Sequence, residues 1–168
     1  MKKIGLLSDT HGDLDPKIFH YFKDVDEIWH AGDVGTIEVI DKLKDFKPLR
    51  GVYGNIDGTE IRSELPLFTV FRCEEVKVLI THIAGRPQKY SKNAYSLIQE
   101  HRPNLFICGH SHILLVQKDP VFNLLWMNPG ACGIKGFHKV KTLLRFEIDN
   151  DKIQNLEVIE IGPRSNIE

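Results

Sequence analysis

The chain has few cysteines, no long apolar run and no excess of charge of one sign. Its three cysteines, Cys73, Cys108 and Cys132, form no CxxC pair, so zinc-finger spacing and a disulfide framework are both excluded. We therefore expect reduced cysteines and a cytoplasmic protein. No run approaches the roughly 18 apolar residues of a membrane helix. The apolar segment Ile4–Leu7 is too short for the core of a signal peptide, so we expect no membrane partner.

The charges are balanced, with 22 Lys and Arg against 23 Asp and Glu, for a formal net charge of −1. Such a chain offers no basic field to long nucleic acid or to a membrane surface. A length of 168 residues fits one domain, residues 1–168, with a single substantial core. We expect residues 161–168 to form a frayed tail.

Five short apolar runs are each followed at once by residues that can bind a metal ion. The runs are Ile4–Ser8, Glu27–Gly32, Leu49–Gly54, Val76–Thr81 and Leu105–Gly109. The residues that follow them are Asp9 and His11, then Asp33, Asn55, His82, and finally His110 and His112. Buried strands read as near-continuous apolar runs, and open α/β sheets hold ligands just beyond the carboxyl ends of their strands. The sequence therefore predicts one metal site assembled at strand C-terminal ends.

Helical stretches separate the first of these strands. One follows Asp13, with Asp15 as a candidate N-cap and Pro16 at the first helical position. Another follows Gly35, where Thr36 could cap and Val39, Ile40 and Leu43 form the apolar stripe. This alternation favours an α/β fold whose strands are parallel with right-handed crossovers.

The second half changes character. Phe68–Arg72 and Val76–Thr81 are separated by a hairpin-length connection, and Ser91–His101 is expected to be a third helix that ends before Pro103. From residue 113 the signals are of strands only, broken by turn residues. These runs cover residues 114–118, 123–127, 141–148 and 153–159. We expect them to extend the fold with antiparallel strands.

The candidate ligands comprise two carboxylates, four imidazoles and one amide. Asp9 and His11 lie two residues apart, as do His110 and His112, so each pair can face one site from an extended segment. Seven ligands exceed what a single ion takes from protein, so two divalent ions are expected. Asp33 is the best candidate to bridge them because a carboxylate has two oxygens.

Such a pair of ions defines a reaction class. Two divalent ions carry a charge of +4, and Asp9, Asp33 and one bridging hydroxide together carry −3. The site therefore has a net charge of +1 and attracts an anion. Metals about 3.5–4 Å apart clamp the attacking and leaving oxygens of an in-line displacement at phosphorus. They also lower the pKa of a shared water towards about 7, which supplies a nucleophile at neutral pH. We therefore expect hydrolysis of a phosphoester.

The five blocks resemble those of the calcineurin-like metallophosphoesterases, in the same order along the chain. They are Asp9-Thr10-His11, Gly32-Asp33, Gly54-Asn55, His82, and Gly109-His110-Ser111-His112. The short chain, together with His30-Ala31-Gly32-Asp33, Gly54-Asn55-Ile56-Asp57 and Asn128-Pro129-Gly130, resembles the small bacterial YfcE-like phosphodiesterase branch.

The resemblance implies a four-layer αββα sandwich, in which two mixed β-sheets are flanked by helices. It implies that one metal is held by Asp9, His11 and His112 and the other by Asn55, His82 and His110, with Asp33 as the bridge. Asp33, Asn55 and His82 would then act in catalysis through the metals and the bridging hydroxide. Family members commonly use Mn²⁺, and some hold Fe²⁺, Zn²⁺, Ni²⁺ or Mg²⁺. Four imidazoles favour a borderline ion and suit magnesium poorly.

Two positions depart from the family pattern. Larger relatives place a histidine after the Asn of the third block, where this chain has Ile56, which cannot transfer a proton. We therefore expect diesters with acidic leaving groups, such as aryl phosphodiesters, to be hydrolysed faster than alkyl monoesters. Many relatives also carry His-Gly-His at the fourth block, where this chain reads His82-Ile83-Ala84.

Several other residues have two interpretations. Asp57 could orient a ligand or cap a turn, and Arg86 could hold a phosphate oxygen or lie solvated on a loop. His30 is expected to pack behind the site. Phe68, Phe71 and Trp126 are most simply core or interface aromatics, and Cys108 is a buried strand residue rather than a ligand.

The leading hypothesis is a two-metal phosphodiesterase that acts on small phosphoesters. One alternative is an interaction scaffold, because the eukaryotic retromer subunit resembles this architecture with a degraded metal site. Another is a nuclease or a cyclic nucleotide phosphodiesterase, although the chain lacks a basic face for long nucleic acid. An exposed sheet edge would allow a homodimer.

Overall fold

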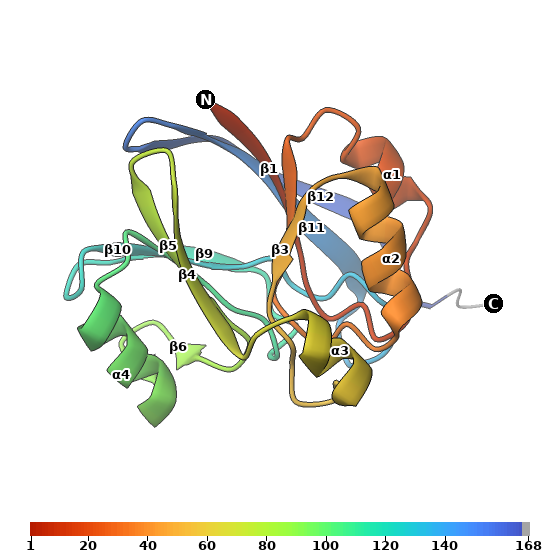
Figure 1. Ribbon diagram of the computed structural model, residues 1–168, viewed down its shortest axis with the longest axis horizontal. Coiled ribbons are helices and arrows are strands. Elements are labelled where there is room, and N and C mark those ends of the chain that lie inside the picture. Colours follow the sequence, from red (N-terminus) through yellow and green to blue (C-terminus); the bar gives the residue numbers. More distant parts are fainter. Residues whose placement is uncertain (166–168) are drawn as a thin grey trace.

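The computed structural model describes residues 1–165 and contains two five-stranded sheets that pack face to face (Figure 1). The first sheet has the order β12-β11-β1-β2-β3. Its strands are β1 (Lys2–Leu7), β2 (Glu27–His30), β3 (Leu49–Gly51), β11 (Val140–Asp149) and β12 (Lys152–Pro163). Strands β1, β2 and β3 are parallel, as the alternation of strands and helices predicts, and β11 and β12 extend the sheet with antiparallel pairs.

The second sheet has the order β4-β5-β8-β10-β9. Its strands are β4 (Phe68–Cys73), β5 (Val76–Thr81), β8 (Leu105–Ile107), β9 (Leu115–Asp119) and β10 (Leu124–Asn128). The three central strands are parallel, and the two edge strands pair antiparallel with their neighbours. A separate two-stranded ribbon is formed by β6 (Gly85–Arg86) and β7 (Lys89–Tyr90). Both large sheets are therefore mixed, as expected.

Helices cover both outer faces of the sandwich. They are α1 (Lys17–Tyr21), α2 (Ile37–Phe46), α3 (Thr59–Glu64) and α4 (Lys92–His101). The first three pack on the first sheet through an apolar cluster that includes Ile18, Ile40 and Ile61. The fourth packs on the second sheet through Ala94 and Ile98. A third apolar cluster fills the space between the sheets, so the predicted four-layer αββα sandwich is confirmed.

The strand sequences carry apolar residues on both faces of each sheet, because one face packs against the other sheet and the opposite face packs against helices. In β1, Ile4 and Leu6 point into the core between the sheets, whereas Leu7 belongs to the cluster beneath the helices. Gly5 lies between them because a Cβ there would come within 2.7 Å of the Phe22 ring. In β5, Ile80 faces the other sheet and Leu79 faces α4. Near-continuous apolar runs are the expected pattern for strands that are covered on both faces.

The helix boundaries agree in part with the sequence prediction. The Oγ of Ser91 caps α4 by accepting from the N–H of Ala94 at 3.3 Å. Thr36 occupies the N-cap position of α2 but makes no side-chain cap bond. Helix α1 begins at Lys17, whose N–H donates to Oδ1 of Asp15 at 2.9 Å. Helix α3 was not predicted, because it is a short helix whose single buried residue is Ile61.

Two expectations from the sequence differ from the structure. The strands after residue 113 are not all antiparallel, because β10 pairs parallel with β8 and so extends the second sheet. The frayed tail is wrong for residues 161–163, which continue β12, and residues 166–168 lie outside the described part. Among the helices described, none is long and apolar enough to cross a membrane.

Candidate metal centre

All seven predicted ligands lie just beyond the carboxyl ends of parallel strands. Asp9 and His11 follow β1, Asp33 follows β2 and Asn55 follows β3 in the first sheet. His82 follows β5, and His110 and His112 follow β8, in the second sheet. Six of these residues form two groups in which the ligand atoms lie within 4.8 Å of one another: Asp9, His11 and His112, and Asp33, His82 and His110.

The two groups meet at their carboxylates. Oδ2 of Asp33 lies 3.2 Å from Nε2 of His82, in its own group, and 3.5 Å from Nε2 of His11, in the other. Oδ1 of Asp9 lies 3.2 Å from Nε2 of His112 and 3.8 Å from Nε2 of His82. Each carboxylate therefore faces imidazoles of both groups, which is the placement that a bridging ligand needs. The seventh residue, Asn55, lies beside the second group, with Oδ1 3.0 Å from Nδ1 of His110.

Several atoms at the centre are buried without a hydrogen-bond partner. Within the described residues these include Oδ1 of Asp9, Nε2 of His11 and Nε2 of His82. Burying an unpaired carboxylate or imidazole nitrogen is costly, and such groups persist where they are paired or coordinate a metal. Imidazole with carboxylate and amide oxygens is a donor set for borderline divalent ions. The residues present therefore fit a divalent metal centre.

The backbone at the ligands is left-handed rather than extended. Asp9, His11, Asp33, His110 and His112 have φ values of 54°, 47°, 54°, 70° and 61°. From the sequence we assumed extended segments, in which side chains two residues apart face one site. That assumption is wrong, because these segments are not extended. His110 and His112 instead point into different groups. Non-glycine residues in this region cost about 1–3 kcal/mol each and cluster at functional sites, where the surrounding structure holds them.

Backbone hydrogen bonds supply that support. The N–H of Asp9 donates to Gly32 O at 2.9 Å, and the N–H of His11 donates to Asp33 O at 3.0 Å. These bonds join the loop after β1 to the loop after β2. The two carboxylates are therefore fixed relative to each other by main-chain geometry, before any metal binds.

Glycines allow the ligand loops to approach closely. A Cβ at Gly54 would overlap Oδ1 and the backbone nitrogen of Asp33. A Cβ at Gly109 would lie 2.7 Å from Oδ2 of Asp9 and would overlap Oγ of Ser8. The blocks Gly54-Asn55 and Gly109-His110 therefore need glycine because the backbone passes directly against a carboxylate of another loop.

A second layer of hydrogen bonds orients these side chains. Nδ1 of His82 donates to Ala31 O at 2.7 Å, which leaves Nε2 directed at the carboxylates. Oδ2 of Asp9 accepts from Oγ of Ser8 at 2.7 Å and from the N–H of His110 at 3.1 Å. Ser8 was not singled out from the sequence, since a serine at a strand end gives no signal of its own.

Asp57 belongs to this second layer. Its buried carboxylate accepts from the N–H groups of Val34 at 3.0 Å, Gly35 at 2.9 Å and Gly54 at 2.8 Å. These residues belong to the loops that carry Asp33 and Asn55. Asp57 thus ties two ligand-bearing loops together, which reconciles the turn-capping and ligand-orienting interpretations.

His30 lies behind the centre, as expected. Its Nδ1 accepts from the N–H of Gly32 at 3.1 Å, so its Nε2 carries the proton and donates to Oγ1 of Thr10 at 3.0 Å. Thr10 in turn donates to Val34 O at 2.8 Å. Burial lowers the pKa of His30 to about 4. In addition, a second proton would have to bind at Nδ1, which already accepts the Gly32 N–H.

The electrostatics keep both carboxylates ionised. Burial raises the pKa of Asp9, but the His11 and His112 imidazoles close to its carboxylate lower it by more, so the net pKa falls below the ordinary value. Burial also opposes ionisation of Asp33, and the nearby His82 ring again reverses the sign. For His82, burial lowers the pKa and the nearby Asp33 carboxylate raises it, with a net increase. The centre is thus a negatively charged pocket that favours cations.

Other predicted residues lie away from the centre. Arg86 is exposed on the β6–β7 ribbon. Ala84, which replaces the second histidine of the family's fourth block, is buried beneath α4. Cys108 is buried, and burial raises the pKa of its thiol well above the ordinary value, so it stays protonated. Of the two interpretations of Phe68, the structure excludes the core, because 37% of its surface is exposed and it lines a cavity beside the centre.

This fold and this centre define a class of protein. The model of the calcineurin-like phosphoesterase superfamily domain matches residues 1–151, and the chain belongs to that superfamily. It is 26% identical to a "Probable metallophosphoesterase" of Methanothermobacter thermautotrophicus over 95% of this chain and 92% of that protein.

Solved structures show the same fold. A novel archaeal phosphodiesterase superposes with a TM-score of 0.72 at 24% identity, covering 94% of this chain and 99% of the other. Vps29 of Chaetomium thermophilum superposes with a TM-score of 0.77 at 14% identity, covering 96% of this chain and 97% of the other. The sequence resemblance to metallophosphoesterases is confirmed, and the protein is a phosphoesterase of this superfamily.

Proposed function

We propose that the protein is a two-metal-dependent phosphodiesterase that hydrolyses small phosphodiesters by in-line displacement. The observation that carries the proposal is the pair of adjacent ligand groups, which share carboxylates and contain buried atoms without partners. An arrangement of this kind suits two divalent cations better than one, because seven donors surround the centre.

The proposed ligands follow the two groups. Asp9, His11 and His112 would hold one ion, Asn55, His82 and His110 the other, and Asp33 would be shared. When bound, two such ions supply a nucleophile at neutral pH and neutralise charge on a phosphoryl group. Manganese is the ion we would use to refill the site, since imidazole, carboxylate and amide donors occur together.

The rim of the centre supports diesters with acidic leaving groups. Ile56, which follows Asn55, is 48% exposed, and its N–H donates to Oδ1 of Asp33 at 3.1 Å. Ile83, which follows His82, is 43% exposed. Neither side chain can donate a proton, so a leaving group at this part of the rim must depart as a stable anion. Aryl esters meet that condition and alkyl esters do not.

The scaffold alternative has one observation in its favour, the close structural likeness to Vps29. Against it, this chain keeps all seven ligand residues and holds six of them within ligand distance of one another. A protein that used only its surface would have no need for strained backbone at five of those positions.

The test is hydrolysis of bis-p-nitrophenyl phosphate and p-nitrophenyl phosphate by metal-stripped protein refilled with manganese. We expect metal-dependent turnover that favours the diester and falls to background in Asp33→Asn. Asp41→Asn, on the exposed face of α2, is the matched control and should keep full activity. Bound manganese is measured alongside. Two bound ions with no turnover of either ester would refute the proposal and favour the scaffold.

A further inference from the structure

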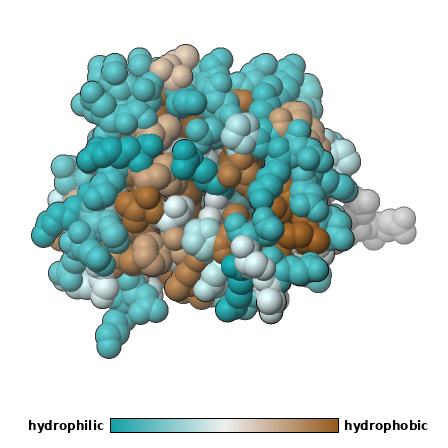
Figure 2. Space-filling view, in the orientation of Figure 1, coloured by the Kyte–Doolittle hydropathy of each residue, from teal (hydrophilic) through white to brown (hydrophobic). Residues whose placement is uncertain are grey.

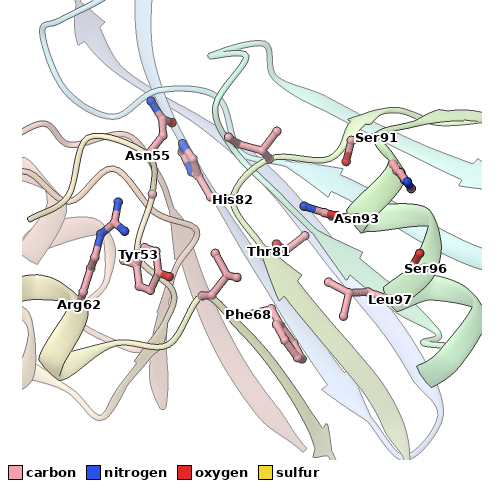
Figure 3. Close-up of a pocket in the computed structure, with 14 residues that line it drawn as sticks. Tyr53, Asn55, Arg62, Phe68, Thr81, His82, Ser91, Asn93, Ser96 and Leu97 are labelled. Carbon is pink, nitrogen blue, oxygen red and sulfur yellow. The ribbon is translucent and has the colours of Figure 1, made fainter.

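A cavity of about 680 Å³ opens beside the metal centre and extends away from it. Its walls come from the loop after β3 and helix α3 on one side and from α4 on the other, with β4 and β5 between them (Figure 3). Two of its lining residues, Asn55 and His82, are proposed ligands. The cavity is therefore continuous with the centre, and its volume is typical of small-molecule sites.

The floor and rim of the cavity are apolar. Leu67 is 55% exposed, Phe68 37% and Ile83 43%, and all three line the cavity. On the face shown in Figure 2, hydrophobic residues gather between α3 and α4. Apolar surface gathered in a hollow gains free energy when an apolar group covers it. The cavity thus favours an apolar occupant over water.

One wall carries a fixed cation. The guanidinium of Arg62 lies over the Tyr53 ring, with Cζ 4.5 Å from the ring centroid. Its Nε donates to the backbone O of Asp57 at 2.6 Å, so the side chain is held at this wall. Figure 3 places Arg62 and Tyr53 on the same side of the cavity as Asn55. A held guanidinium near a phosphoester site suits the negative charge of the substrate.

The opposite wall combines polar groups with the cationic Lys92 and the apolar Leu97. Asn93 and Ser96 line the cavity from α4, and Ser91 lines it from the N-cap of that helix (Figure 3). Their hydroxyl and amide groups can donate and accept hydrogen bonds at the edge of an aromatic ring system. An apolar floor with polar groups along one edge is the surface that a heteroaromatic ring needs, because its faces are apolar and its edge is not.

We propose that this cavity binds a flat aromatic group on the non-leaving arm of the phosphodiester. The inference rests on the proposed function, since the phosphorus must lie at the ligand end near Asn55 and His82. The aromatic group then covers Leu67 and Phe68, and Arg62 and Lys92 offset the phosphoester charge. A nucleoside arm and a simple aryl arm share this chemistry.

The test compares three esters with one leaving group, p-nitrophenol. The non-leaving arm is methyl in methyl p-nitrophenyl phosphate, a nucleoside in the p-nitrophenyl ester of thymidine 5′-phosphate, and aryl in bis-p-nitrophenyl phosphate. The methyl and thymidine esters have similar intrinsic reactivity, because both arms are alkyl. We expect kcat/KM to be about tenfold higher for the thymidine ester, as burial of a ring predicts. The aryl arm of bis-p-nitrophenyl phosphate also raises its intrinsic reactivity, so only a gain that is lost in Ser96→Trp would extend the site to any aryl group.

Two variants on α4 separate the cavity from general effects. Ser96→Trp places a ring inside the cavity, and Gln99→Trp places the same ring on the exposed helix outside it. We expect Ser96→Trp to reduce the ratio of kcat/KM for the thymidine and methyl esters to about one, and Gln99→Trp to leave the ratio unchanged. Equal kcat/KM for both esters in the wild type, or a ratio that survives Ser96→Trp, would overturn the inference.

A binding measurement separates this inference from the proposed function. If manganese-loaded protein hydrolyses none of the esters, the proposed function fails, and thymidine is titrated into metal-free protein by amide NMR. Shifts at Thr81 and Ser96 that disappear in Ser96→Trp would support the cavity as an aromatic site. No shift at these amides in the wild type would overturn it.

Discussion

Replacement of Asp57 by asparagine should weaken both the fold and the metal centre. Oδ2 of Asp57 accepts from Val34 and Gly54, and Oδ1 accepts from Gly35. The best placement of an asparagine amide keeps its oxygen at the Oδ2 position, so its NH₂ group faces the N–H of Gly35. One charge-assisted bond is then lost, and two others become neutral.

The magnitude follows from these three bonds. A hydrogen bond to a charged group contributes about 1.5–3 kcal/mol, and a neutral one about half of that. We expect Asp57→Asn to lower the free energy of unfolding of the metal-free protein by about 3–6 kcal/mol, half of it from the lost bond and half from the two weakened ones. Because the bonds position the loops of Asp33 and Asn55, manganese affinity should also fall about tenfold.

The assay is urea unfolding followed by circular dichroism, together with calorimetric titration of manganese. Asp41→Asn makes the same chemical change on an exposed helix face and should stay within about 0.5 kcal/mol of the wild type. The reasoning would be refuted if the two variants unfolded at the same urea concentration with the same slope. Unchanged manganese affinity in a destabilised Asp57→Asn would refute only the link between this carboxylate and the ligand loops.

Two further predictions concern the surroundings of the ligands. Burial lowers the pKa of His30 to about 4, whereas the same group in the unfolded chain has a pKa of about 6.5. As the pH falls through this window the unfolded chain binds a proton and the folded protein does not, so the folded state loses about 3 kcal/mol of stability between pH 7 and pH 4. The measurement is the difference in unfolding free energy between metal-free wild type and His30→Gln at each pH, and a difference that does not change with pH would contradict the prediction. Gly54→Ala should reduce manganese affinity and lower the unfolding free energy by about 1–3 kcal/mol, because its Cβ would overlap Asp33. Gly58→Ala is its control, since a Cβ there meets nothing within 4 Å, and equal behaviour of the two variants would count against a steric role for Gly54.

Much of the first sheet followed from sequence periodicity. The apolar runs that became β1, β2 and β3 are separated by helices, and parallel pairing follows because strands joined by helical crossovers run the same way. The later strands carry the same apolar pattern without such connections. Only the folded chain shows that β10 pairs with β8 and that β11 pairs with β1.

The candidate ligand residues were likewise identifiable from sequence, because five apolar runs in succession are each followed by a residue that can bind a metal. The cavity was not. Tyr53, Arg62, Phe68 and Ser96 are separated in the chain and carry ordinary residue types, so no motif connects them. Arg86, which follows a ligand closely in sequence, lies on the exposed ribbon instead.

The sequence by itself determined which residues surround the centre, because strand ends and glycine-flanked blocks fix where polar groups can stand. The tertiary structure decided how they are grouped. His110 and His112 are neighbours in the chain, yet left-handed backbone at both turns one towards Asp33 and the other towards Asp9. Those conformations depend on contacts from another sheet, such as the bond from the N–H of His110 to Asp9, which local sequence does not encode.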